Sequence, residues 1–148
     1  MKRTFVFAFC LSCFLLASAC KERPVETGSS DRISLLTDKN SYAKLDTINL
    51  CLKNNSGFDI VVGLRCGSYL EMFYQEKDDD HWSDNLWFWY MSLRCLTLLD
   101  TIETNNTLRH SLPAGIFDST GTFRLLVDVY IREGDCRETI ISNYFKIE

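Results

Sequence analysis

Apolar and polar residues alternate with a period of two along most of this chain. The pattern is clearest near the C-terminus, where every second residue is apolar: Phe123, Leu125, Val127, Val129 and Ile131. The segment Asp46–Lys53 repeats it. No window carries the apolar stripe that a helix of three turns needs. Because successive strand residues face opposite sides of a sheet, the alternation predicts strands with one buried face.

Nine such segments are expected to form strands, separated by turn signals such as Asn54–Gly57 and Glu133–Asp135. They are Arg32–Thr37, Asp46–Lys53, Phe58–Leu64, Tyr69–Gln75, Leu86–Met91, Cys95–Ile102, Thr107–Leu112, Thr122–Arg132 and Glu138–Ile147. Consecutive strands without a helical crossover favour antiparallel pairing. We therefore predict an all-β protein, an antiparallel Greek-key immunoglobulin-like sandwich over residues 33–148.

The N-terminus has the layout of an export signal. Lys2 and Arg3 precede an uncharged stretch, Thr4–Ala19, that is shorter than the ~20 residues needed to span a bilayer as a helix. The sequence Ala-Ser-Ala before Cys20 resembles the lipobox of bacterial lipoproteins, in which the cysteine thiol receives a diacylglyceryl group. The resemblance implies a signal peptide over residues 1–19 and lipidation of Cys20 with acyl chains such as palmitate. Cleavage by the ordinary signal peptidase, giving a secreted protein, is the alternative.

The polar residues after the cysteine are expected to form a tether. Residues 20–32 contain Pro24, Gly28 and two serines, and only Val25 is apolar enough to bury. A two- or three-chain lipid anchor on Cys20 would hold the domain at a membrane permanently. Lys21 stands where aspartate often retains lipoproteins at the inner membrane, which favours the outer membrane of a bacterial cell envelope. Whether the domain faces the periplasm or the cell surface stays open.

Charge and motifs narrow the function classes. The net charge is −4 and the isoelectric point about 5.2, and no basic cluster occurs, so we expect no nucleic-acid partner. The chain contains no G-x-S-x-G, H-E-x-x-H or phosphate-binding glycine motif. His110 is in phase with Leu108 and Leu112, which favours a half-buried structural imidazole over a catalytic base. We predict neither an enzyme nor a bound cofactor.

Four cysteines remain in the body of the chain once those of the signal and the lipidated one are set aside: Cys51, Cys66, Cys95 and Cys136. An even number in an exported chain suggests two disulfides. If the strands are wired as in an immunoglobulin-like sandwich, Cys66–Cys95 and Cys51–Cys136 are the preferred pairs. Cys51 is out of phase with the buried positions of its strand, which weakens the second pair. Buried free thiols are the alternative.

Several segments resemble the immunoglobulin-like domains of bacterial lipoproteins. They are SYAKLDTINLCLKNNSGFDIVVG, LPAG, GTFRLLVDV and the terminal SNYFKI, and together they extend from about Tyr42 to Ile147. The chain departs from the pattern at Ile116–Thr120, an insertion, and in its four cysteines. The resemblance, closest in character to Bacteroides-type envelope lipoproteins, implies this fold and an envelope location. It implies no catalytic residues and no fixed ligand.

The densest candidate chemistry lies in Glu76–Met91. Trp87 and Trp89 share one face of the expected strand, and Phe88 and Tyr90 share the other. A sandwich strand buries one face, so one aromatic pair is expected to be exposed, covered by a loop or held in a subunit interface. Exposed flat rings bind sugars or apolar peptide side chains. The candidate ligand-binding residues are Trp82, Trp87, Phe88, Trp89 and Tyr90.

The neighbouring acidic run has a plainer interpretation. Asp78, Asp79, Asp80, Asp84 and His81 could offer ligands to Ca²⁺, but their spacing is not that of a formed calcium loop. A solvated hairpin tip is favoured, and no metal site is predicted.

The combined prediction is a lipid-anchored envelope protein whose non-catalytic immunoglobulin-like domain binds a glycan or a peptide. An accessory or structural subunit of an envelope complex is the alternative. A proteinase-inhibitor-like module is a weaker one, which would need a rigid projecting loop at Ile116–Gly121.

Overall fold

The computed structural model describes residues 32–131 and 136–148, so the expected signal peptide, Cys20 and nearly all of the tether lie outside the described residues. Within those ranges the chain forms strands and two short 3-10 helices. In chain order these are β1 (Ile33–Thr37), β2 (Ser41–Tyr42), β3 (Thr47–Asn54), β4 (Ile60–Arg65), β5 (Tyr69–Leu70), β6 (Met72–Asp78), β7 (His81–Trp82), β8 (Leu86–Trp87), η1 (Trp89–Ser92), β9 (Thr97–Ile102), β10 (Thr107–Pro113), η2 (Ala114–Ile116), β11 (Gly121–Ile131), β12 (Cys136–Ile141) and β13 (Phe145–Ile147).

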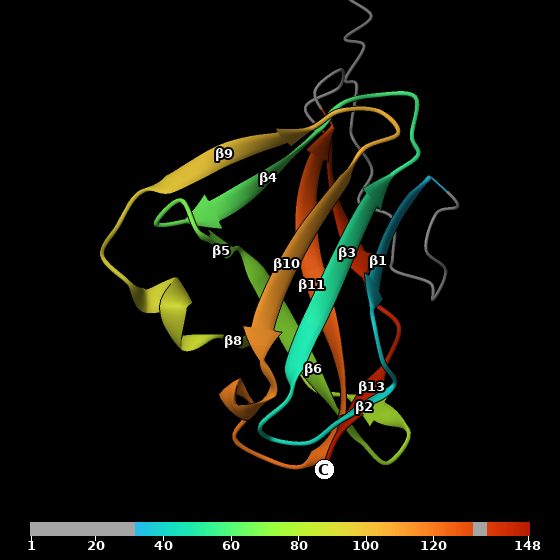
Figure 1. The fold of residues 1–148 in the computed structure, drawn as a ribbon, viewed down its shortest axis with the longest axis vertical. Helices are drawn as coiled ribbons and strands as arrows, with labels where there is room; N and C mark the ends of the chain where they lie inside the picture. Colours follow the sequence, from blue (N-terminus) through green and yellow to red (C-terminus); the bar gives the residue numbers. More distant parts are fainter. Residues whose placement is uncertain (1–31, 132–135) are drawn as a thin grey trace, which may run out of the picture.

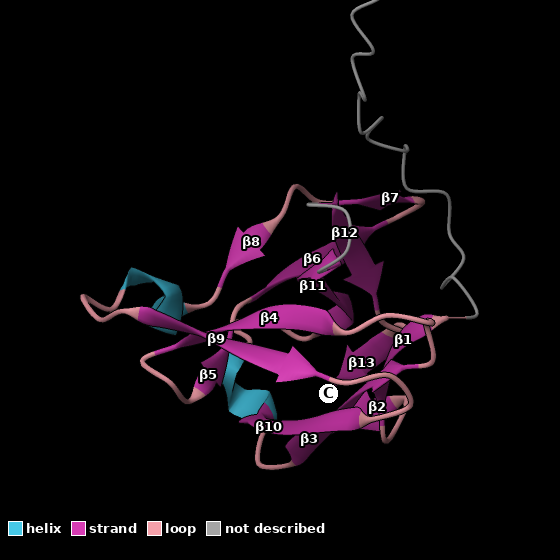
Figure 2. Cartoon of the chain, turned by 90° about the horizontal axis from the view of Figure 1, so that it is seen from above, coloured by secondary structure: helices cyan, strands magenta, loops and turns pink. Residues whose placement is uncertain are grey.

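Two sheets pack face to face (Figures 1 and 2). The smaller sheet has the order β1-β3-β10, and the larger is built on β2-β13-β11-β4-β5, with β12, β6 and β9 added at its sides. The chain crosses between the sheets from β1 to β2, from β2 to β3, from β3 to β4, from β9 to β10 and from β10 to β11. Nearly all neighbouring strands are antiparallel; β13 and β2 pair in parallel. The fold is an antiparallel Greek-key immunoglobulin-like sandwich, as the alternation predicted.

The core lies between the sheets and uses the expected alternate residues. Leu50 of β3 and Val127 of β11 are buried, as are the residues two positions to either side of each. Each such apolar side chain contributes roughly 1.5–3 kcal/mol by leaving water. Aromatic rings fill one end of the core, where Phe117 contacts Phe123 with ring centroids 4.7 Å apart and Phe145 with centroids 5.6 Å apart.

Three expected strands differ from the observed ones. Tyr69–Gln75 divides at Glu71, because β5 pairs with β4 whereas β6 pairs with β11. The last expected strand divides into β12 and β13, which pair with different stretches of β11. The strand expected at Leu86–Met91 ends at Trp87 and continues as η1, because only Leu86 and Trp87 have partners on β6.

The cysteine pairing is confirmed in one case and wrong in the other. Cys66 and Cys95 form a disulfide with Cα atoms 5.2 Å apart. Cys51 is a free thiol. Cys136 is disulfide-bonded, but not to Cys51, so the predicted Cys51–Cys136 bond is wrong. The reason is that Cys51 lies on the outward face of the smaller sheet, whereas Cys136 begins β12 of the larger sheet.

Candidate functional site

A cleft opens where two strands of the larger sheet part from each other. β4 pairs with β11 only at Ile60 and Val61, and β6 takes the place beside β11 from Met72 onward. β4 then leans outward together with β9, as Figure 1 shows. Between the parted strands lies a cleft of about 140 Å³.

Aromatic and apolar side chains line part of this cleft, here called the aromatic wall: Phe73, Trp87, Met91 and Tyr130. The Trp87 indole is 62% exposed and meets the Phe73 ring edge-on, with centroids 4.4 Å apart. Tyr130 is 46% exposed on the outward face of β11. Three flat rings from three strands therefore border one cavity, and flat rings give a ligand large contact area at low entropic cost.

Charged groups line the rest of the cleft. Asp128 accepts hydrogen bonds from the Arg137 guanidinium and from the Thr139 hydroxyl, the latter at 2.6 Å. The Glu71 carboxylate accepts a hydrogen bond from the Thr97 hydroxyl. Within residues 32–131 and 136–148, no Lys, Arg or His nitrogen lies within ion-pair distance of this carboxylate. Of the charged groups that line the cleft, Glu71 is therefore the one whose charge has no direct partner among the described residues.

Gly63 allows β4 and the Glu71 side chain to come together. A Cβ atom at this position would lie 2.5 Å from Glu71 Oε2 and 3.1 Å from the Thr97 side chain. The first contact is closer than non-bonded atoms tolerate and the second is tight, so a side chain at position 63 would displace the Glu71 carboxylate from its place over β4. The backbone supports the same placement, because the Glu71 amide donates to the Gly63 carbonyl at 2.8 Å.

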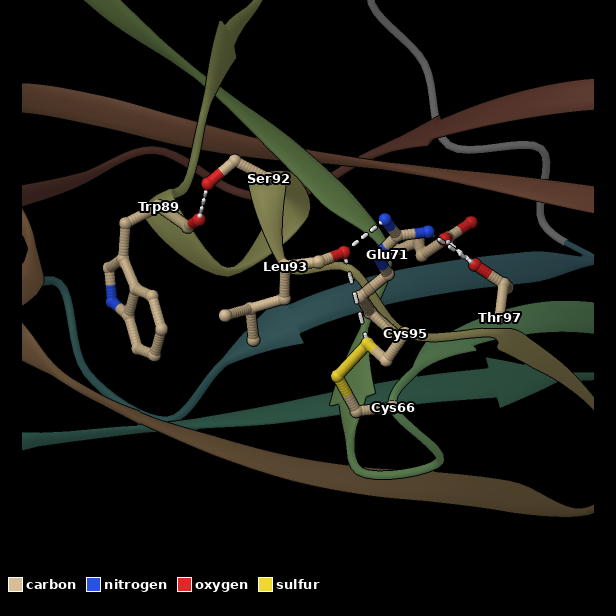
Figure 3. The surroundings of a disulfide bond; sticks show 8 residues. Cys66, Glu71, Trp89, Ser92, Leu93, Cys95 and Thr97 are labelled. Carbon is tan, nitrogen blue, oxygen red and sulfur yellow. Dashed lines mark hydrogen bonds between the residues drawn. A yellow bond between two sulfur atoms is a disulfide. The ribbon is translucent and has the colours of Figure 1, made fainter.

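A disulfide and several hydrogen bonds attach the segment with Trp87 and Trp89 to the larger sheet (Figure 3). The Cys66–Cys95 disulfide ties the chain after η1 to the end of β4, and the Arg65 guanidinium donates to the Leu93 carbonyl and to the Thr97 hydroxyl. The Tyr90 hydroxyl donates to the Leu70 carbonyl at 3.0 Å. Burial raises the pKa of Tyr90 above its ordinary value, so the phenol stays protonated as this donor. The aromatic wall is thus preformed.

The structure separates the five aromatic candidates. Trp87 lines the cleft, whereas Trp89 is 58% exposed on η1, outside it, with its ring edge-on to Tyr69. Phe88 and Tyr90 are each only 2% exposed, and their rings stack with centroids 5.4 Å apart in the core. They support the site from beneath and have no surface for a ligand.

Trp82 lies elsewhere on the same sheet. Its ring packs against the Arg124 guanidinium, 4.2 Å from the ring centroid, near the β6–β7 hairpin. The acidic run forms the tip of that hairpin, where Asp78 pairs with His81 and the aspartates are exposed, as the sequence indicated. Among the described residues no group of three His, Cys, Asp or Glu side chains could hold a metal ion.

Sequence reasoning missed most of the cleft. Its charged residues, Glu71, Asp128 and Arg137, come from the bend before β6, from β11 and from β12, and nothing in their spacing brings them together. Asp128 and Tyr130 did carry one signal, because both interrupt the apolar pattern of β11 on its outward side.

The segment considered for an inhibitor loop is tied down. Phe117 is buried in the core, and the Lys44 ammonium donates to the Phe117 and Ser119 carbonyls.

His110 is half-buried as expected, and burial lowers its pKa. In the described part of the chain, no helix is long and apolar enough to cross a membrane.

Comparisons with known proteins give no family. No family model matches the chain, and no curated protein matches it. Solved structures that align with it include an uncharacterized protein from Bacillus anthracis strain Ames, with 13% identity and a TM-score of 0.38 over 84% of this chain and 98% of that one. Another is an ASH/PapD-like domain of human CEP192, with 15% identity and a TM-score of 0.36 over 90% of this chain and 95% of that one.

Proposed function

We propose that this protein is a non-catalytic binding module, held at a bacterial envelope membrane by lipid on Cys20, and that its cleft binds a glycan. The observation that carries the proposal is the exposed Trp87 indole beside a cleft that Glu71, Asp128 and Arg137 also line. Sugar rings have apolar faces that stack on flat aromatic rings and hydroxyls that bond to carboxylates and guanidinium groups. The cleft offers both kinds of group within one small cavity.

The strand pairing favours a glycan over an extended peptide. A peptide that adds to a sheet needs a run of unpaired main-chain groups. Beside the cleft, β11 pairs with β12 on one side and with β6 or β4 on the other, which leaves only Asp128 and Val129 without a strand partner on the cleft side. Recognition in this cleft therefore depends on side chains.

Two exposed tryptophans provide a matched test of the glycan site. We expect Trp87→Ala to weaken binding of a neutral oligosaccharide such as cellotetraose about tenfold, since it removes a stacking surface. Trp89→Ala should leave the affinity within about twofold, because Trp89 is as exposed but lies outside the cleft. Titration calorimetry with the full chain in detergent measures both. Equal losses in the two variants, or binding by neither variant nor wild type, would contradict a glycan site in this cleft.

Lipid attachment is tested separately. We expect cells fed radiolabelled palmitate to label the wild-type chain, and Cys20→Ala to lose the label and leave the membrane fraction. Cys51→Ala is the control, because Cys51 is a free thiol in the folded domain. An unlabelled wild-type chain, or label that persists in Cys20→Ala, would contradict the anchor.

An accessory role in an envelope complex is supported by one further observation. β4 and β9 form an arm that exposes leucine side chains. Leu98 and Leu99 of β9 are 55% and 73% exposed, and Leu96, just before β9, is 81% exposed. Exposed apolar groups on an edge strand are typical of protein contacts. Crosslinking in cells, compared between wild type and Leu99→Ser, tests this role; an unchanged set of crosslinked partners would argue against it.

A further inference from the structure

We propose that the cleft selects a ligand with a primary ammonium group, which for the glycan site proposed above means an amino sugar with a free amine. The inference rests on that proposed function and names its ligand class. It follows from the ion pairs in the cleft, which leave Glu71 without an ion-pair partner among the described residues, and from the groups that surround Glu71.

The charges that line the cleft do not balance. Asp128 and Arg137 form an ion pair, so their charges offset each other. The third charged residue on the cleft, Glu71, has no ion-pair partner in the described ranges. The Arg65 guanidinium lies near Glu71, since both contact the Thr97 hydroxyl, but it makes no ion pair with the carboxylate and its side chain does not line the cleft. The cleft lining itself therefore carries one excess negative charge.

One oxygen of Glu71 remains available to a ligand. Oε1 accepts the Thr97 hydroxyl, whereas Oε2 lies over Gly63, which also lines the cleft. A ligand that displaces water here must offer a hydrogen-bond donor to Oε2. An ammonium donor forms a charge-assisted bond of roughly twice the strength of a neutral one, so it outcompetes a hydroxyl at this position.

The aromatic wall favours the same ligand charge. Phe73, Trp87 and Tyr130 border the cavity, and ring faces attract cations. A cation held between these rings and Glu71 gains from both sides. An acetylated amine at the same place has no charge to match the carboxylate and adds bulk to a cleft of about 140 Å³. An anionic sugar would be repelled.

Three tetrasaccharides that differ only at ring carbon 2 test the inference. Cellotetraose carries a hydroxyl there, chitotetraose an acetamido group, and the glucosamine tetramer an amine that is largely protonated at about pH 6. Calorimetry uses the full chain in detergent. We expect the glucosamine tetramer to bind at least about tenfold more tightly than the other two, and its advantage to shrink as salt concentration rises.

Two matched variants complete the test. Glu71→Gln should weaken binding of the glucosamine tetramer more than binding of cellotetraose, and so reduce the advantage of the glucosamine tetramer to about twofold or less. Glu103→Gln, the same substitution on an exposed loop outside the cleft, should change neither. Equal binding of all three sugars, lowered together by Trp87→Ala, would overturn the ammonium inference and leave the glycan site standing. No binding of any sugar, or binding of trilysine in their place, would overturn both.

Discussion

The Cys66–Cys95 disulfide makes a quantitative prediction. The bond closes a loop with a sequence separation of 29, which contains β5, β6, β7, β8 and η1. In the chain-entropy treatment, a closed loop of n residues lowers the entropy of the unfolded chain by about 2.1 + 1.5R ln n cal/mol/K, which for this loop is about 12 cal/mol/K. At 25 °C the bond should therefore stabilise the folded state by about 3.6 kcal/mol.

The perturbation is the double substitution Cys66→Ala with Cys95→Ala, and the assay is urea unfolding of the full chain followed by circular dichroism. We expect the free energy of unfolding to fall by roughly 3–4 kcal/mol. Cys51→Ala is the control for cysteine removal, because Cys51 is a free, partly exposed thiol. It should change the free energy by less than about 1 kcal/mol.

Ligand affinity shows whether this disulfide only stabilises the fold or also holds Trp87 in place. Trp87 keeps its place through pairing of β8 with Phe73 of β6 and through the buried rings of Phe88 and Tyr90, none of which needs the disulfide. We therefore expect the double variant, while still folded, to bind glycan within about threefold of wild type. A stability loss below about 1 kcal/mol would refute the entropic argument, and a large affinity loss in the folded variant would refute the claim that packing preforms the wall.

Three further predictions concern Gly63, His110 and Asp38. Gly63→Ala should push the Glu71 carboxylate away from β4 and weaken binding of the glucosamine tetramer in calorimetry about tenfold; unchanged affinity would contradict the packing of these two residues. Burial lowers the pKa of His110, so the unfolded chain binds more protons below about pH 6.5 and stability should fall as pH drops through that range; His110→Phe should flatten this slope in urea titrations, and an equal slope in both chains would contradict it. Desolvation alone would raise the pKa of Asp38, but hydrogen bonds from Tyr42 and Asn49 outweigh it and lower the pKa from 3.8 to about 2. The stability that ionised Asp38 contributes should therefore be lost as pH falls from about 4 to 2. Thermal melts should show this loss in the wild type and not in Asp38→Asn.

The period-two pattern was sufficient to predict the fold because each strand of the core buries one face. Leu50 and Val127 lie where their alternation with polar neighbours placed them, on the two sheets that meet in the core. The same rule predicted that one aromatic pair would be buried, and Phe88 and Tyr90 are. Trp87 and Trp89 are both exposed, but they share no strand face, because the strand ends at Trp87 and Trp89 begins η1. Local alternation carries this information without knowledge of the partner strand.

Register and strand division could not be predicted in this way. The break at Glu71 exists because β4 and β6 both compete for the same side of β11, and each pairs with it along a different stretch. Cys51 illustrates the same limit. The alternation in the sequence already placed Cys51 on the outward face of its strand. The sheet to which each cysteine belongs depends on long-range strand pairing, and Cys51 and Cys136 lie in different sheets and form no bond with each other.

The cleft is a consequence of that competition. Where β4 parts from β11, neither strand can pair fully with the other, and Asp128 loses the neighbour that a continuous sheet would give it, although Tyr130 still pairs with Val61. Gly63 and Glu71 then close the gap from the other side, since a glycine lets the carboxylate reach across β4. A sequence with an ordinary side chain at Gly63 would keep the same sandwich, because its core alternation is untouched, but it would hold Glu71 away from β4. The fold and the site therefore depend on different residues, and substitutions at Gly63 or Glu71 should change ligand binding with little change in the free energy of unfolding.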